Sequence, residues 1–107
     1  MKWNVLMTDT AKSDLREIAL YIYDRSGDAE TAASFVQTLQ EQCLALESFP
    51  ERGGFPKDYV LKALGYRYLV YEHDLIFYQI DSHELDVTIL AFFNEKADYF
   101  RYMRKRI

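Results

Sequence analysis

The sequence is poor in cysteine, proline and glycine, with one, two and four of them among 107 residues. The single cysteine, Cys43, excludes an internal disulfide, which is typical of proteins in a reducing cytoplasm. His73 and His83 do not stand at zinc-ligand spacing from Cys43, so no metal is expected. No apolar run approaches the roughly 18 residues that span a bilayer. Residues 1–10 lack a signal-peptide core. We therefore expect a cytoplasmic protein without a membrane segment.

Sequence signatures of common catalytic sites are also missing. There is no G-x-S-x-G elbow, no phosphate-binding G-x-x-x-x-G-K and no dinucleotide-binding G-x-G-x-x-G. The Gly53-Gly54 pair indicates only a loop. Cys43 lies on an apolar helical stripe and is interpreted as a core residue, because free cysteine is commonly buried. No cofactor is expected.

The composition predicts one packed domain over residues 1–107. Half of the residues are hydrophobic and 16% are aromatic, enough for a sizeable core. The net charge of −4 is unevenly distributed, since residues 1–95 carry −8 and residues 96–107 carry +4. The acidic body repels nucleic acid, whereas the basic tail would attract it or an acidic protein. The plainer interpretation of the tail is a solvated helix end that complements the helix dipole.

Hydrophobic periodicity predicts a strand and two helices in the first half of the chain. Residues 2–8 alternate as a strand does. A helix follows from its expected N-cap, Thr10, to the break at Ser26-Gly27-Asp28. A second helix, capped by Asp28, ends before Phe49-Pro50, because proline disfavours a helical conformation in the preceding residue. The short connection makes the two helices a hairpin.

The period changes to two after the loop at 50–59. Strands are predicted at about 65–72, 75–81 and 85–93, with hairpin turns at His73-Asp74 and Ser82-His83-Glu84. In the last strand one face is predicted to hold Val87, Ile89, Ala91 and Phe93, and the other Asp86, Thr88, Leu90 and Phe92. A short C-terminal helix, capped by Asn94, has an apolar side with Ala97, Phe100, Arg104 and Ile107.

This order of elements predicts an α+β fold. An N-terminal strand and a two-helix hairpin precede a three-stranded meander and the short C-terminal helix, and the hairpin packs on an antiparallel sheet. Whether the first strand joins the edge or the middle of the sheet stays open at this stage.

Arg67 is the one residue of the meander that packing does not explain. It stands between Tyr66 and Tyr68, on the strand face shared by Leu69 and Tyr71. One interpretation is an ion pair at the sheet rim, with the stem covering apolar surface. The other is a guanidinium held on a rigid strand for phosphate or carboxylate recognition.

An ordered set of motifs runs through nearly the whole chain and begins with the pattern A-x-x-D-L-x-x-I-x-x-Y-I over residues 11–22. Further motifs follow in order: A-x-x-F-x-x-x-L at 32–39, C-x-x-L-x-x-F-P at 43–50, Gly53, G-Y-R at 65–67, I-F-Y-x-I at 76–80 and the hydrophobic last strand at 87–93. This succession resembles the RelE/ParE superfamily of bacterial type II toxins, the plasmid-stabilisation toxin family, and the first pattern is similar to its opening helix. The β-α-α-β-β-β core of the superfamily agrees with the element order predicted here.

The resemblance implies a growth-inhibiting toxin neutralised by a cognate antitoxin that wraps its helices and sheet. ParE-like members poison DNA gyrase, whereas RelE-like members cut messenger RNA on the ribosome with basic residues and often a C-terminal tyrosine. For a nuclease, the resemblance points to Arg67, Lys96 and Tyr102 as catalytic residues. Contacts with the target or the antitoxin are expected from Lys57, Lys62, Tyr99, Arg101 and Arg104. A homodimer and a hetero-oligomer with the antitoxin both remain open.

Two departures favour the ParE-like mechanism. Asn94 and Glu95 stand where many superfamily members carry a basic or histidine-arginine stretch. The acidic body would also weaken docking on RNA in physiological salt. We therefore expect gyrase poisoning, with mRNA cleavage as the alternative. A third hypothesis is a non-toxic relative that serves only as a protein-binding module.

Overall fold

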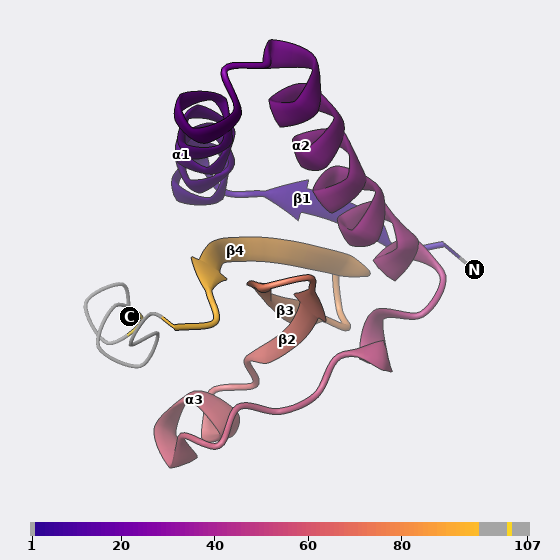
Figure 1. The fold of residues 1–107 in the computed structure, drawn as a ribbon. Coiled ribbons are helices and arrows are strands. Elements are labelled where there is room, and N and C mark those ends of the chain that lie inside the picture. The colour runs from indigo at the N-terminus through magenta and orange to yellow at the C-terminus, as the bar shows by residue number, and fades with distance from the viewer. Residues whose placement is uncertain (1, 97–102, 104–107) are drawn as a thin grey trace.

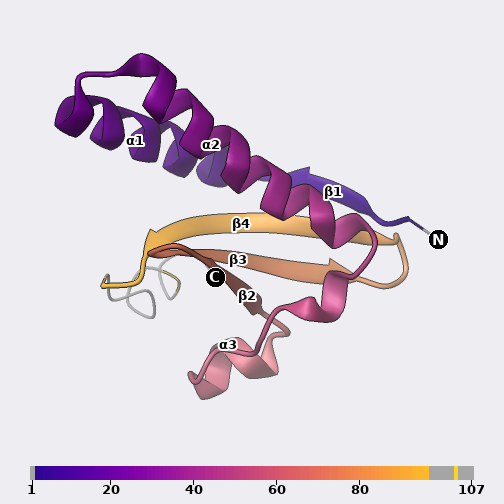
Figure 2. The ribbon, with the colours of Figure 1, turned by 45° about the vertical axis from the view of Figure 1, so that its right-hand side comes forward.

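The computed structural model describes residues 2–96 and 103. The helices are α1 (Asp9–Ser26), α2 (Ala29–Leu44) and α3 (Tyr59–Ala63), and the strands are β1 (Asn4–Met7), β2 (Arg67–Tyr71), β3 (Asp74–Asp81) and β4 (Asp86–Asn94). Short 3-10 turns occupy Ala45–Glu47 and Pro50–Arg52. The α1–α2 hairpin covers one face of the sheet, and α3 lies beyond the other face (Figures 1 and 2). The predicted α+β fold is confirmed.

The helix hairpin begins and turns at polar caps. Thr8, not Thr10, is the N-cap of α1, because its hydroxyl accepts a hydrogen bond from the backbone N–H of Ala11. Gly27 ends α1 with a left-handed φ of 68°. Asp28 caps α2 as predicted and accepts from the N–H of Glu30. The hairpin is therefore fixed by local side-chain to backbone hydrogen bonds.

The sheet is mixed, with the strand order β1-β4-β3-β2. The three C-terminal strands form the predicted antiparallel meander. The expectation of a wholly antiparallel sheet is corrected at β1, which lies at the edge and runs parallel to β4, with Asn4 opposite Asp86. The helix hairpin carries the chain across the sheet face after β1, so no tight turn imposes an antiparallel partner.

The strand ends and turns differ from the prediction by one or two residues. The β2–β3 turn consists of Glu72 and His73, and Asp74 already belongs to β3. Glu72 adopts a positive φ of 55°, which closes the hairpin one residue earlier than expected. At the β3–β4 turn, Leu85 also has a positive φ, 57°. Asp74 is thereby placed inside the sheet.

A β-bulge in β4 overturns the predicted face assignment of its second half. Phe77 pairs with Ala91 and Tyr78 with Ile89, so Leu90 is the extra residue. Val87 and Ile89 pack toward the helices, and beyond the bulge it is Phe92 that joins them. Ala91 and Phe93 face the opposite side instead. The end of β4 therefore has buried side chains on both faces of the sheet.

Two hydrophobic clusters therefore lie on either side of the sheet. The larger one joins the helix hairpin to the sheet: Ala11, Leu15, Leu39, Cys43, Leu46, Ile76, Tyr78, Val87, Ile89 and Phe92. The smaller one lies on the α3 side: Leu61, Tyr66, Leu75, Phe77, Ala91, Phe93 and Met103. Cys43 is confirmed as a core residue, and burial raises the pKa of its thiol to about 12.

The predicted C-terminal helix falls largely on residues 97–102 and 104–107, which lie outside the described part of the chain. Asn94, its expected cap, is the last residue of β4, and its side-chain oxygen accepts from the N–H of Lys96. No helix in residues 2–96 is long and apolar enough to cross a membrane.

Candidate functional site

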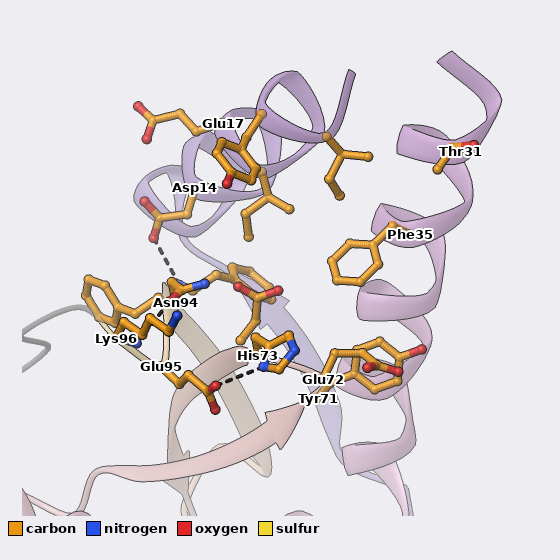
Figure 3. A pocket seen from close by; sticks show the side chains of 16 residues that line it. Asp14, Glu17, Thr31, Phe35, Tyr71, Glu72, His73, Asn94, Glu95 and Lys96 are labelled. Carbon is orange, nitrogen blue, oxygen red and sulfur yellow. Dashed lines mark hydrogen bonds and ion pairs between the residues drawn. The ribbon is translucent and has the colours of Figure 1, made fainter. Parts of the chain in front are cut away.

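An open groove lies between the helix hairpin and one end of the sheet (Figure 3). Its volume is about 1070 Å³. The groove is formed where α1 and α2 pass over the β2–β3 turn and the end of β4. The lining comprises Asp14, Glu17, Ile18, Tyr21, Ile22, Thr31, Phe35, Tyr71, Glu72, His73, Asp74, Phe92, Phe93, Asn94, Glu95 and Lys96. It is therefore built from four segments that are separate in sequence.

The groove has an aromatic interior and an acidic border. Phe35 of α2 contacts Tyr71 of β2, with ring centroids 6.0 Å apart. Five carboxylates line it, against one lysine and one histidine. His73 Nδ1 lies 2.8 Å from Glu95 Oε1 across the β2–β3 turn and the end of β4. Asp14 Oδ2 accepts a 3.0 Å hydrogen bond from the N–H of Phe92 and so ties α1 to β4. Such a surface fits an apolar segment that also carries positive charge.

Asp74 is the most buried charged residue of the groove, with 9% of its surface exposed. Among the described residues, its carboxylate has no hydrogen-bond or ion-pair partner. Burial raises the pKa of Asp74; neighbouring His73 opposes the shift, and Glu95 adds to it. Sequence reasoning missed this residue, although an aspartate entering the apolar run Leu75–Tyr78 was a readable signal.

We predict that Asp74→Asn stabilises the free protein. The pKa of Asp74 is higher in the folded protein than in the unfolded chain, so as the pH rises the carboxyl group loses its proton first in the unfolded chain. The wild type therefore loses stability as the pH rises from the usual pKa of an aspartate to the raised one. The neutral amide of the variant does not titrate, so at pH 7 its free energy of unfolding should exceed that of the wild type by about 1 kcal/mol. Thermal melts at pH 3 and pH 7 test this, with a gain expected only at pH 7. A variant that melts lower at pH 7 would contradict it.

Arg67 holds the loop that precedes α3. Its Nη1 donates to the backbone oxygens of Gly53, at 2.9 Å, and Glu51, at 3.2 Å. Its guanidinium carbon lies 4.2 Å from the centre of the Phe55 ring, a cation–π distance. Within residues 2–96 the predicted rim ion pair is not formed, and the partners of Arg67 are backbone carbonyls and an aromatic ring. Arg67 fastens the loop at residues 51–55 to the start of β2.

Tyr78 fastens the same loop from within the core. Its buried hydroxyl donates to the oxygen of Pro50 at 2.6 Å and accepts from the N–H of Gly53 at 2.9 Å. A Cβ at Gly53 would lie 2.4 Å from that hydroxyl and 2.8 Å from the backbone oxygen of Tyr68. Gly53 is therefore more than the loop residue that sequence alone indicated. Glycine at this position is required by close packing.

The predicted basic site residues are distributed over separate places. Lys62 of α3 lies 5.7 Å from the centre of the Phe55 ring, so it shares this ring with Arg67. Lys57 is exposed in the loop before α3. Lys96 lines the groove, two residues beyond the end of β4. Tyr99, Arg101, Tyr102 and Arg104 lie outside the described residues.

Arg67 and Lys96 do not meet. Arg67 opens β2, while Tyr71 at its other end aligns with Asp74 and, through it, with Asn94. The four residue steps from Arg67 to Tyr71 cover about 13 Å of strand. Lys96 follows two residues after this Asn94 end of β4. Among the described residues there is also no group of acidic, histidine or cysteine side chains arranged to hold a metal.

Comparison with known proteins gives a family and a fold. A family model of the ParE toxin of the type II toxin-antitoxin system parDE matches residues 5–99. The chain is similar to a structure of the chromosomal ParDE TA system from P. aeruginosa, with a TM-score of 0.72 and 22% identity over 87% of this chain and 96% of that one.

Two further solved structures share the fold. One, of the toxin-antitoxin complex RelBE2 from Mycobacterium tuberculosis, has a TM-score of 0.65 and 22% identity, and covers 88% of this chain and 92% of that one. The other, of a free E. coli RelE mutant, has a TM-score of 0.68 and 12% identity, and covers 100% and 99%. No curated protein matches the sequence.

Proposed function

Because this chain belongs to the ParE toxin family of type II toxin-antitoxin systems, we propose that it arrests growth by poisoning DNA gyrase and that a cognate antitoxin neutralises it. The resemblance to ParE-like toxins motivates the target. The structural neighbours include the toxin-antitoxin complex of M. tuberculosis and a ParDE system, which supports an antitoxin as partner.

The placement of Arg67 is the observation that carries the choice of gyrase over RNA. A nuclease of the RelE kind needs a cation positioned to stabilise the charge that develops on the phosphate. Here one guanidinium nitrogen is bonded to two loop carbonyls, and the group rests on Phe55. Lys96 lies beyond the far end of the sheet, so the two predicted catalytic cations do not converge on one phosphate. This arrangement supports a structural role for Arg67.

The groove is the proposed binding site of the antitoxin. Its aromatic interior offers Phe35, Tyr71 and Phe92 to an apolar segment. On the hairpin, Leu20, Tyr21 and Tyr23 are also exposed. Apolar side chains of this size in contact with solvent on one helix are typical of a surface that is covered in a complex.

Expression of the protein alone, followed by assays on both targets, tests the proposal. We expect growth arrest, inhibition of supercoiling when the purified protein is added to gyrase and relaxed plasmid, and accumulation of cleaved DNA. Primer extension on cellular mRNA should show no codon-phased cuts. Premixing with the cognate antitoxin is the control and should restore supercoiling.

Two outcomes would contradict gyrase poisoning. Codon-phased cuts together with unaffected supercoiling would assign the protein to the mRNA-cleaving mechanism. Normal growth at high levels of folded protein would instead leave a binding module without toxicity.

A further inference from the structure

The end of the groove concentrates negative charge around one buried group. Glu72, Asp74 and Glu95 all line this end, where the β2–β3 turn lies beside the end of β4. The carboxylate of Glu95 is engaged with His73. That of Asp74 has no partner among the described residues, although Asp74 is nine-tenths buried. No fully buried side-chain oxygen of the described residues lacks a partner, so the Asp74 carboxylate is partly open to the groove. Its partial desolvation still costs stability, which a cation or a hydrogen-bond donor in the groove would recover.

The cations of the described chain do not supply that partner. His73, the adjacent residue, is directed to Glu95 at 2.8 Å. Lys96 lines the groove but forms no ion pair among the described residues. Met103, in the basic tail, packs into the cluster on the opposite face of the sheet with Leu61 and Tyr66. Among the described residues no cation pairs with Asp74, and the open side of the groove gives a route by which one can approach it.

We propose that Asp74 is a specificity-determining residue that receives a basic side chain of the antitoxin. The inserted segment carries apolar residues against Phe35, Tyr71 and Phe92, and an arginine or lysine whose charged group reaches Asp74 beside Glu72 and Glu95. The inference rests on the proposed function, because the antitoxin is the occupant. The inference goes beyond the proposed function because it assigns a positive charge to the antitoxin segment and identifies Asp74 as the residue that recognises this charge.

Charge complementarity supports this occupant. The groove contains five carboxylates against Lys96 and His73, within a body that carries −8 over residues 1–95. Such a surface favours a cationic segment and opposes an acidic one. A charge-assisted bond to a partly desolvated carboxylate is also stronger than one at the surface. The stability that the free protein loses at Asp74 would be recovered on binding.

Binding of the antitoxin to Asp74→Asn provides the test. Titration calorimetry with the cognate antitoxin gives its affinity for each variant. We expect Asp74→Asn to weaken binding by at least about tenfold and to reduce its salt dependence. The matched control is Glu84→Gln, which removes the same charge from an exposed turn at the opposite end of the sheet. Equal affinities of Asp74→Asn and the wild type would overturn the proposal even if the antitoxin neutralises the protein.

A second measurement decides the question without any antitoxin. N-acetyl-L-argininamide is titrated into the ¹⁵N-labelled protein, with N-acetyl-L-glutaminamide as the neutral probe. We expect only the arginine probe to shift the amide signals of residues 71–75 and 94–96, in the wild type and Glu84→Gln but not in Asp74→Asn. Absence of these shifts in the wild type would overturn the cation site. Shifts that appear only after Arg101→Gln and Arg104→Gln would assign it to the chain's own tail, and would also overturn the proposal.

Discussion

Replacing Gly53 with alanine is expected to lower the free energy of unfolding by about 3 kcal/mol. The new Cβ would lie 2.4 Å from the Tyr78 hydroxyl and 2.8 Å from the backbone oxygen of Tyr68. One contact is with a strand backbone and the other with a buried tyrosine side chain, so neither neighbour can move away without a large cost in free energy. Moving Tyr78 would also break its bonds to Pro50 and Gly53. Urea denaturation measures the loss.

Gly54 offers a matched control one residue further along the loop. A Cβ placed there meets no atom within 4 Å. Gly54→Ala should therefore change the free energy of unfolding by less than about 0.5 kcal/mol. Gly53 has an extended backbone with φ −77° and ψ 155°, so its requirement for glycine comes from packing and not from backbone strain. Similar denaturation midpoints for the two variants would disprove the close packing.

Arg67→Ala is expected to lower the free energy of unfolding by about 2 kcal/mol. The change removes two hydrogen bonds to loop carbonyls and the cation above Phe55. Lys62→Ala is the matched control, because its ammonium lies further from the same ring, at 5.7 Å, and Lys62 is exposed. It should cost less than about 0.5 kcal/mol.

The same variant separates support of the loop from catalysis. If Arg67 acts by holding the loop, growth arrest by Arg67→Ala should fall only as far as the amount of folded protein falls. Expression at low temperature, with soluble protein matched to the wild type, should then restore arrest. Complete loss of arrest at a matched level of folded protein would instead identify Arg67 as a residue that acts on the target.

The fold was predictable from sequence wherever a local pattern determined it. Helical stripes, the Gly27 break and the Asp28 cap placed the hairpin, and two short turns placed the meander. The parallel pairing of β1 had no local signal, because its partner is the last strand. The bulge at Leu90 also had no signal in the sequence. Residues 90–93 are all apolar, so they fit a buried strand whichever of them face the helices. Both errors concern partners chosen by tertiary packing.

The candidate site was predicted less well than the fold. Sequence singled out Arg67, whose contacts are with carbonyls of its own loop, and no pattern reveals such acceptors because every residue carries one. Asp74 escaped notice among 17 acidic residues, since its distinction is depth and not identity. The groove combines segments from both halves of the chain, and its charge is apparent only after they are assembled.

The pairing of β1 with β4 also determines when the protein can finish folding during its synthesis. Asn4 and Asp86 are joined by a side-chain hydrogen bond across 82 positions, and the backbone N–H of Thr8 donates to Ile89. A nascent chain would therefore hold its first strand unpaired until β4 has left the ribosome. Closing so long a loop is slow, and helices with local contacts form sooner. The helix hairpin, which forms one wall of the groove, would emerge well before the finished sheet. An antitoxin already present in the cell would thus meet the helical wall of its proposed binding groove before the sheet is complete.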